Sequence, residues 1–152
     1  WDTAQGKAID FGNLLHEMLS KIITNNDVNL VTIQYHQKGF INNIQLKLIK
    51  EMLYLVVNHP KLAVYFSDQV TVFNEREIVD FDNQVVIPDR LVFNSKNQVT
   101  IIDYKTGSPA SEHKQQLLKY EKVLKSMNFS IDKKFLIYRN EKIDVVEVSV
   151  KK

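Results

Sequence analysis

Apolar residues in the first third of the chain recur at the spacing of an α-helix, three or four positions apart. One side of such a helix carries Leu14, Leu15, Met18, Leu19, Ile22 and Ile23. Asp10, just before this run, is a candidate N-cap. The same spacing predicts a weaker helix over Leu30–Gln37 and a stronger one over Ile41–Val57, which ends before Pro60.

From Gln69 onward the pattern changes to short runs of β-branched and aromatic residues, which are typical of strands. Helical spacing returns once, over Ser111–Met127. The strand-like runs are Val70–Phe73, Val85–Ile87 and Val99–Ile102 before that helix, and Phe135–Tyr138 and Val145–Val148 after it. A strand, a helix and another strand form the crossover that joins parallel strands. We therefore expect an α/β (α+β) fold with a mixed sheet.

No internal repeat, low-complexity tract or Pro/Gly-rich linker interrupts the 152 residues, so we expect a single domain over 1–152. Its helical part would cover about 1–68 and its sheet core about 69–152. The chain begins with Trp1 rather than Met, and we expect it to be a piece of a longer protein.

The amino-acid composition excludes several classes of function. The absence of Cys excludes disulfides, thiol nucleophiles, Cys-ligated zinc and iron–sulfur clusters, and it fits a reducing, cytoplasmic environment. The four glycines are scattered, which excludes a Walker A loop and a dinucleotide-binding motif. No apolar run approaches the roughly 18 residues that span a membrane. The net charge is only +2, so DNA binding would depend on local groups.

The strongest candidate for chemistry lies at the end of the Val99–Ile102 run. Asp103 and Lys105 are two positions apart, so in a strand both side chains continue its apolar face. A carboxylate there can bind a hard divalent cation, and a lysine beside it can orient a water or stabilise phosphoryl charge. The alternative is a surface salt bridge. The same acid-x-lysine spacing occurs at Glu112–Lys114 and Asp132–Lys134, where it does not end an apolar strand.

Asp89 interrupts the otherwise apolar stretch Val85–Phe93. A carboxylate buried among apolar residues is costly unless it is paired or binds a metal. An ion pair with its neighbour Arg90 is disfavoured, because successive residues of a strand face opposite sides.

The register of a hairpin decides whether the two aspartates meet. If Phe93 pairs with Val99 across a five-residue loop, Asp89 falls opposite Asp103 on the same face. A loop of two or four residues would place them on opposite faces. We therefore expect an odd-length hairpin loop, or a bulge near Pro88.

Together these residues resemble the nuclease domain of RecB- and AddA-type helicase–nucleases, in the PD-(D/E)XK superfamily. The resemblance covers nearly the whole chain, and it rests on five motifs in the family's order. They are Gly12–Glu17 (Gly-x-x-x-His), Glu75–Ile78, Pro88–Val92, Asp103–Gly107 and Gln116–Tyr120 (Gln-x-x-x-Tyr).

The resemblance implies a Mg²⁺- or Mn²⁺-dependent deoxyribonuclease that hydrolyses DNA phosphodiesters, and an exonuclease acting on DNA ends in recombinational double-strand break repair. It implies DNA as substrate and an ATP-dependent helicase motor as partner, in the same chain or in another subunit. This chain would then be the C-terminal part of the helicase–nuclease. The absence of Cys favours the branch of the family without an iron–sulfur cluster.

The resemblance also implies a set of metal ligands. Asp89 and Asp103 would bind the metal, and the backbone carbonyl of Ile102 or Tyr104 would be a further ligand. His16 would approach the metal from the helical part. Without the resemblance, His16 reads as an ordinary half-buried polar residue of an amphipathic helix.

The resemblance also implies roles for four other residues. Lys105 would orient the attacking water, and Glu75 would be the acid of the first strand. Gln116 and Tyr120, four positions apart on one helix face, would contact the substrate. Each has a plainer interpretation: Glu75 as a solvent-facing residue, Gln116 as a helix edge and Tyr120 as a core aromatic.

Two alternatives to a nuclease stay open at this point. One is a module with the nuclease fold that binds DNA or a helicase partner and no longer cuts. The other is an unrelated α/β domain in which these acids are structural.

Overall fold

The computed structural model describes residues 4–140 and 142–150. The chain divides into two compact units, with the boundary between Ser67 and Asp68. The first unit is helical and the second contains the sheets. The expectation that the two units form a single domain stays a prediction.

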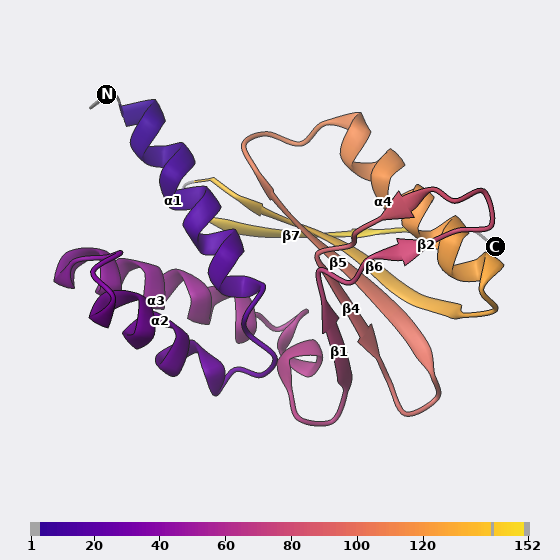
Figure 1. Ribbon diagram of the computed structural model, residues 1–152, viewed down its shortest axis with the longest axis horizontal. Coiled ribbons are helices and arrows are strands. Elements are labelled where there is room, and N and C mark those ends of the chain that lie inside the picture. Colours follow the sequence, from indigo (N-terminus) through magenta and orange to yellow (C-terminus); the bar gives the residue numbers. More distant parts are fainter. Residues whose placement is uncertain (1–3, 141, 151–152) are drawn as a thin grey trace. The chain divides into compact units, whose positions relative to one another are not determined.

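The helical unit consists of α1 (Ala4–Leu19), α2 (Asp27–Gln37), α3 (Asn43–Val57) and the short 3₁₀ helix η1 (Ala63–Phe66) (Figure 1). The three predicted helices are confirmed, and their apolar faces supply the fully buried Met18, Ile22, Ile49, Leu53, Leu62 and Phe66. The prediction of an N-cap was wrong, because α1 begins at Ala4 and Asp10 lies inside it. The predicted run to Ile23 also overshot the end of α1 at Leu19.

A reciprocal pair of hydrogen bonds fixes the start of α3. The Asn42 side chain accepts a hydrogen bond from the Gln45 amide at 2.8 Å, and the Gln45 side chain accepts one from the Asn42 amide at 2.9 Å. This capping box satisfies two backbone N–H groups that the helix itself leaves unpaired.

Asn42→Ala is expected to lower the free energy of unfolding by about 1 kcal/mol, because alanine leaves the Gln45 amide without its side-chain acceptor. Chemical denaturation followed by circular dichroism measures the change. Asn43→Ala, at the first helical position, is the matched control and should have a much smaller effect. Equal effects of the two substitutions would contradict the capping role of Asn42.

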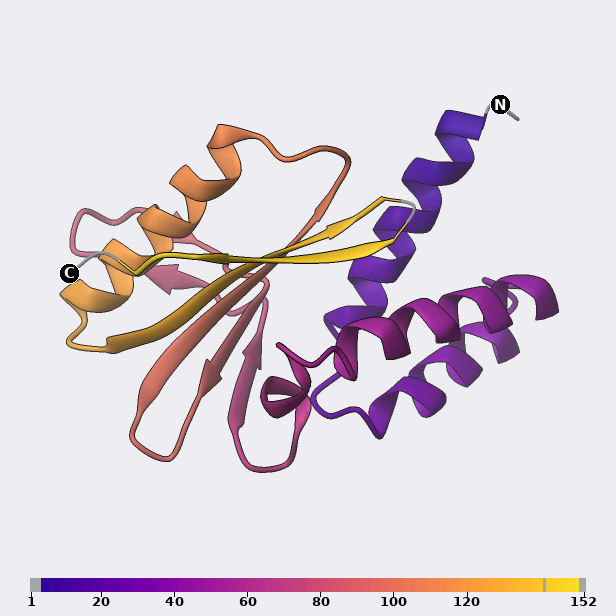
Figure 2. The ribbon, with the colours of Figure 1, turned by 180° about the vertical axis from the view of Figure 1, so that it is seen from behind.

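The second unit is built on a five-stranded sheet in the order β1-β4-β5-β6-β7 (Figures 1 and 2). Its strands are β1 (Thr71–Asn74), β4 (Arg90–Phe93), β5 (Gln98–Thr106), β6 (Ser130–Arg139) and β7 (Ile143–Val148). Strands β5 and β6 are parallel and are joined by the crossover helix α4 (Ser111–Ser126), whereas the other pairs are antiparallel. The predicted α/β fold with a mixed sheet is therefore confirmed.

The apolar stretch 85–93 is two strands rather than one. Strand β3 (Val85–Val86) pairs with β2 (Ile78–Val79) in a separate two-stranded sheet, and β4 starts anew at Arg90. The physical reason is Pro88, which has no amide hydrogen to continue a ladder. The sequence pattern missed β2, which is only two residues long.

The hairpin between β4 and β5 has the predicted register. Phe93 pairs with Val99, and the loop between them is residues 94–98, five residues. The side chain of Asn94 closes this loop by accepting hydrogen bonds from the amides of Lys96 and Gln98, both at 2.9 Å. The expected odd-length loop is confirmed.

Helix α4 covers one face of the sheet, and the core of the unit lies between them. Members of this core from both layers include Leu91, Val99, Ile101, Leu117, Val123, Leu124 and Leu136. At one end of the helix–sheet layer, Glu121 of α4 and Lys134 of β6 form an ion pair at 2.5 Å, with side chains only 1% and 2% exposed. Lys125 also reaches Glu121, at 2.7 Å.

Within residues 4–140 and 142–150, no helix combines the length and the apolar character needed to cross a membrane.

Candidate active site

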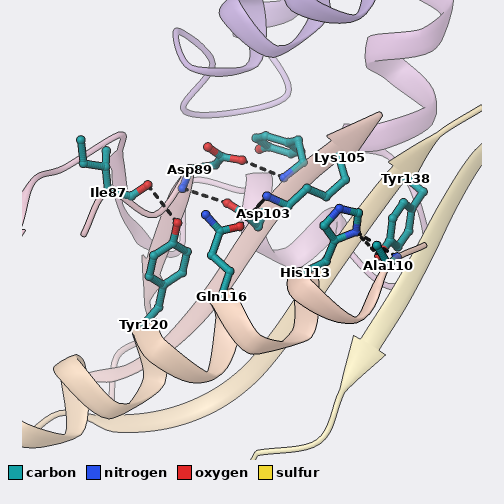
Figure 3. A network of polar contacts seen from close by, with 10 residues as sticks. Ile87, Asp89, Asp103, Lys105, Ala110, His113, Gln116, Tyr120 and Tyr138 are labelled. Atoms are coloured by element: carbon teal, nitrogen blue, oxygen red, sulfur yellow. Dashed lines mark hydrogen bonds and ion pairs between the residues drawn. The ribbon is translucent and has the colours of Figure 1, made fainter. Parts of the chain in front are cut away.

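Asp89 and Asp103 lie next to each other at one end of the β4–β5 hairpin. Asp89 directly precedes β4, and Asp103 follows the last residue of β5 that pairs with β4. The Tyr104 amide donates a hydrogen bond to Asp89 Oδ2 at 2.8 Å, and the Asp89 amide approaches Asp103 Oδ1 at 3.4 Å (Figure 3). Asp103 is 1% exposed. The hairpin register thus places two carboxylates side by side, that of Asp103 buried and that of Asp89 partly buried.

Lys105 lies on the same face of β5 as Asp103, as their spacing predicts. Its ammonium group is 2.8 Å from Asp103 Oδ2 and donates a hydrogen bond to Gln116 Oε1 at 2.5 Å. Helix α4 therefore holds the lysine from the opposite side, and the ammonium group is fixed beside the carboxylate (Figure 3).

The charges at this site favour a bound cation. Burial, together with the neighbouring charge of Asp89, raises the pKa of Asp103 to about 7, and Lys105 only partly opposes this rise. Two adjacent carboxylates in a poorly hydrated position repel each other, and a divalent cation removes that repulsion. The carboxylate oxygens of Asp89 and Asp103 are ligands that fit Mg²⁺ or Mn²⁺.

Glu75 lies directly after β1, in a conformation that L-amino acids rarely adopt. Its φ is +51°, in the left-handed region, and its amide donates a hydrogen bond to the Asp89 carbonyl at 3.0 Å. A carboxylate oxygen of Glu75 lies within 4.8 Å of one of Asp89. Strained backbone of this kind is common at functional sites. Glu75 therefore joins the two aspartates as a third acid.

The main chain of Tyr104 also faces this site. The amide and carbonyl of one strand residue point to the same edge of the strand, and the Tyr104 amide points to Asp89. Its carbonyl is thus directed to the same edge, just past the last β4 pair, in which Arg90 faces Ile102. Of the two carbonyls expected as ligands, this geometry favours that of Tyr104.

Gln116 and Tyr120 both extend from α4 toward the carboxylates (Figure 3), and their contact with substrate stays a prediction. The Tyr120 hydroxyl is 3.5 Å from the carbonyl of Ile87. Burial, and then the charges of Asp103 and Asp89, raise the pKa of Tyr120. Tyr120 therefore lies close enough to the acids to respond to their charge.

His113 is a residue that the sequence analysis missed. It lies one turn before Gln116 on α4, and its Nδ1 is 2.8 Å from the Tyr138 hydroxyl (Figure 3). Its position three residues before the Gln-x-x-x-Tyr motif, on the same helix face, was the available signal. His16 lies on α1 of the helical unit, and its role as a metal ligand stays a prediction.

These features define a class of protein: a mixed sheet that carries two aspartates and a lysine on neighbouring strands, with a crossover helix over them. A model of the PD-(D/E)XK nuclease superfamily matches residues 1–144, and the chain belongs to that superfamily. Its nucleases generally use divalent metal ions. No curated protein matches the sequence.

Among solved structures, the chain is similar to the protein described as SSO0001, with 19% sequence identity and a TM-score of 0.38. The alignment covers 76% of this chain and 60% of that one.

Proposed function

We propose that this chain is a metal-dependent deoxyribonuclease of the RecB/AddA type. The observation that carries the proposal is the convergence of Asp89, Asp103 and Lys105 at one buried end of the sheet. Membership of the nuclease superfamily supports the same reaction, hydrolysis of a phosphodiester bond.

The roles of the residues follow from their chemistry. Asp89, Asp103 and the Tyr104 carbonyl would hold Mg²⁺ or Mn²⁺, with His16 as a further proposed ligand. When bound, the cation polarises a phosphoryl oxygen and lowers the pKa of a bound water.

The remaining catalytic groups act by donating or accepting hydrogen bonds. Lys105 orients the attacking water and stabilises the negative charge that develops on the phosphoryl oxygens. Glu75 provides a further carboxylate that accepts hydrogen bonds from ordered water. Gln116 keeps the ammonium group of Lys105 in place, and Gln116 and Tyr120 contact the DNA.

The finer parts of the proposal rest on the resemblance to RecB- and AddA-type proteins. They are exonucleolytic processing of DNA ends in double-strand break repair, a helicase motor as partner in the same chain or another subunit, and a place in the cytoplasm. The sequence contains no phosphate-binding loop of the kind that an ATP-dependent motor uses.

A cleavage assay tests the proposed function. Linear single- and double-stranded DNA, labelled at one end, is incubated with the protein in Mg²⁺, in Mn²⁺ and in EDTA. We expect degradation with either metal and none in EDTA. DNA binding without cleavage in any metal would instead favour the non-cutting module.

Lys105→Met is expected to reduce the turnover rate about 100-fold, because the ammonium group is a preorganised donor at the reacting phosphate. Methionine retains the apolar length of the side chain without its charge. The measurement is the cleavage rate at saturating Mg²⁺ and DNA. Lys133→Met, which removes an exposed lysine 3.5 Å from Glu147 on the same sheet, is the control and should cleave normally. Normal cleavage by Lys105→Met would remove Lys105 from the mechanism.

A further inference from the structure

The ladders that β4 forms with its two neighbours, β1 and β5, both end just before the three acids of the candidate site (Figure 1). The last pair of β1 with β4 is Asn74 with Arg90, and the last pair of β4 with β5 is Arg90 with Ile102. Beyond these pairs, the Tyr104 amide bonds to the side chain of Asp89 rather than to its backbone. The alignment of the acids therefore needs contacts other than the regular ladder.

The side chain of Arg90 lies on the other face of the sheet from α4. Leu91, the next residue, belongs to the core under α4, and successive residues of a strand alternate between the two faces. Arg90 therefore points to the opposite face, the reverse face, together with its ladder partners Asn74 and Ile102. Tyr104, two positions after Ile102, shares this face. The exposed fraction of Arg90 is 0%, so its charge is completely buried there.

The guanidinium group of Arg90 joins the strands on both sides of β4. Its Nη1 donates a hydrogen bond to Asn74 Oδ1 of β1 at 3.3 Å. On the other side it donates one to the Tyr104 hydroxyl of β5. Burial raises the pKa of Tyr104, and the positive charge of Arg90 opposes this rise, as expected for two groups in contact. One side chain thus contacts both neighbouring strands.

Each residue of this cluster is next in the sequence to one of the three acids. Asn74 precedes Glu75, Arg90 follows Asp89, and Tyr104 follows Asp103. Consecutive Cα atoms keep a fixed distance, so the position of each cluster residue limits the position of its acid. The contacts of the guanidinium group on the reverse face are therefore transmitted to the carboxylates on the other face.

We propose that Arg90 is a positioning residue that holds the three acids in place from the reverse face of the sheet. This inference rests on the proposed function and adds to it a residue that contacts neither the metal nor the DNA. An arginine suits the role, because its planar guanidinium group carries five N–H donors in a fixed geometry and always keeps its charge. It can reach partners on two sides at once, whereas a lysine ammonium group is a compact point charge.

Amide hydrogen exchange, measured by NMR in EDTA, tests the alignment without metal, DNA or cleavage. The reporters are the amides of Tyr104 and Glu75, which both donate hydrogen bonds to Asp89. Arg90→Met keeps the apolar length of the side chain without its donors. We expect both reporter amides to exchange about tenfold faster in this variant, relative to the amide of Ile101 in the middle of β5. A role in overall stability alone would accelerate all three amides alike.

Two milder substitutions each remove one contact of the guanidinium group, and they serve if Arg90→Met does not fold. Tyr104→Phe deletes the hydroxyl, and Asn74→Ala deletes the acceptor on β1. Each should accelerate exchange of the reporter amides about threefold relative to Ile101. Thr100→Val is the matched control, because Thr100 is a buried polar residue of β5 on the same face, two ladder positions away from Arg90. It should leave the reporters unchanged.

Arg90→Lys separates the geometry of the guanidinium group from its charge. The variant keeps a positive charge at the same position but cannot reach both neighbouring strands in the same way. We expect its reporter amides to exchange as fast as those of Arg90→Met. Exchange at the rate of the wild type in Arg90→Lys would overturn the bridging role.

Metal binding is a second readout. Titration with Mn²⁺, followed by the electron paramagnetic resonance signal of the free ion, should show about tenfold weaker binding in Arg90→Met than in the wild type. The acids themselves remain in this variant. Higher Mn²⁺ concentrations should therefore restore much of the cleavage rate of Arg90→Met at saturating DNA, but not that of Asp103→Asn.

The outcomes separate this inference from the proposed function. Unchanged exchange of the reporter amides, relative to Ile101, in Arg90→Met and in the two milder variants would overturn the positioning role, while cleavage by the wild type would still support the nuclease. Faster exchange in these variants, in a protein whose wild type neither binds Mn²⁺ nor cleaves DNA, would support the positioning role and remove the nuclease.

Discussion

Replacing Asp103 by asparagine is expected to lower metal-dependent DNA cleavage by about 1,000-fold while the protein stays folded. Asparagine has nearly the same shape but no charge, so it binds a divalent cation weakly and cannot pair with the ammonium group of Lys105. The fold should persist, because the substitution also removes the repulsion between the buried carboxylate of Asp103 and the partly buried one of Asp89.

Two measurements check this expectation. Cleavage rates of end-labelled DNA at several Mg²⁺ concentrations report the activity, and the melting temperature reports the fold. Asp132→Asn is a matched control, because Asp132 has the same two-residue spacing to Lys134 on the neighbouring strand but is exposed. Asp132→Asn should cut normally. Substantial cleavage by Asp103→Asn at saturating Mg²⁺ would exclude Asp103 as a metal ligand.

The largest loss of stability is expected for Lys134→Met, at about 3 kcal/mol. Lys134 and Glu121 are almost completely buried, so removing the lysine leaves a carboxylate with less compensation than it needs. Lys125, which is partly exposed, still contacts Glu121, and this contact limits the loss. Chemical denaturation gives the change in the free energy of unfolding.

A double variant shows whether the loss comes from the charge of Glu121, which keeps only part of its compensation in Lys134→Met. Glu121→Leu combined with Lys134→Met replaces the pair by apolar side chains, and it should recover most of the stability lost by Lys134→Met alone. Lys133→Met, at an exposed position of the same strand, should change stability by less than about 0.5 kcal/mol. A double variant no more stable than Lys134→Met would mean that the loss comes from packing rather than charge.

Much of this fold follows from the spacing of apolar residues. The three N-terminal helices, α4 and the parallel crossover to β6 were predictable because each long element has one buried face. Short elements were not. Strands β2 and β3 have two residues each, and the break at Pro88 moves β3 out of the main sheet. The start of α1 was misplaced because Asp10 is a residue type that favours the N-cap, although Ala4, Ala8 and Phe11 continue the helical spacing before it.

The candidate site was predictable where it depends on register. The five-residue loop fixes which face Asp89 occupies, and the spacing of Asp103 and Lys105 fixes theirs. The positive φ of Glu75 and the contact of Gln116 with Lys105 were not predictable, because both depend on how distant segments pack. The place of His113 on the helix face of Gln116 could have been read from the sequence, but its contact with Tyr138, 25 positions later, could not.

The parallel pairing of β5 with β6 has a consequence for the order in which the site forms during folding. The hairpin that brings Asp89 to Asp103 closes only a short loop, residues 94–98. Pairing β5 with β6 must first close a loop that contains all of α4, and this costs more chain entropy. We therefore expect the acidic pair to form early and helix α4 to dock on the sheet later. A nascent chain can hold both aspartates in register before Gln116 of α4 reaches Lys105.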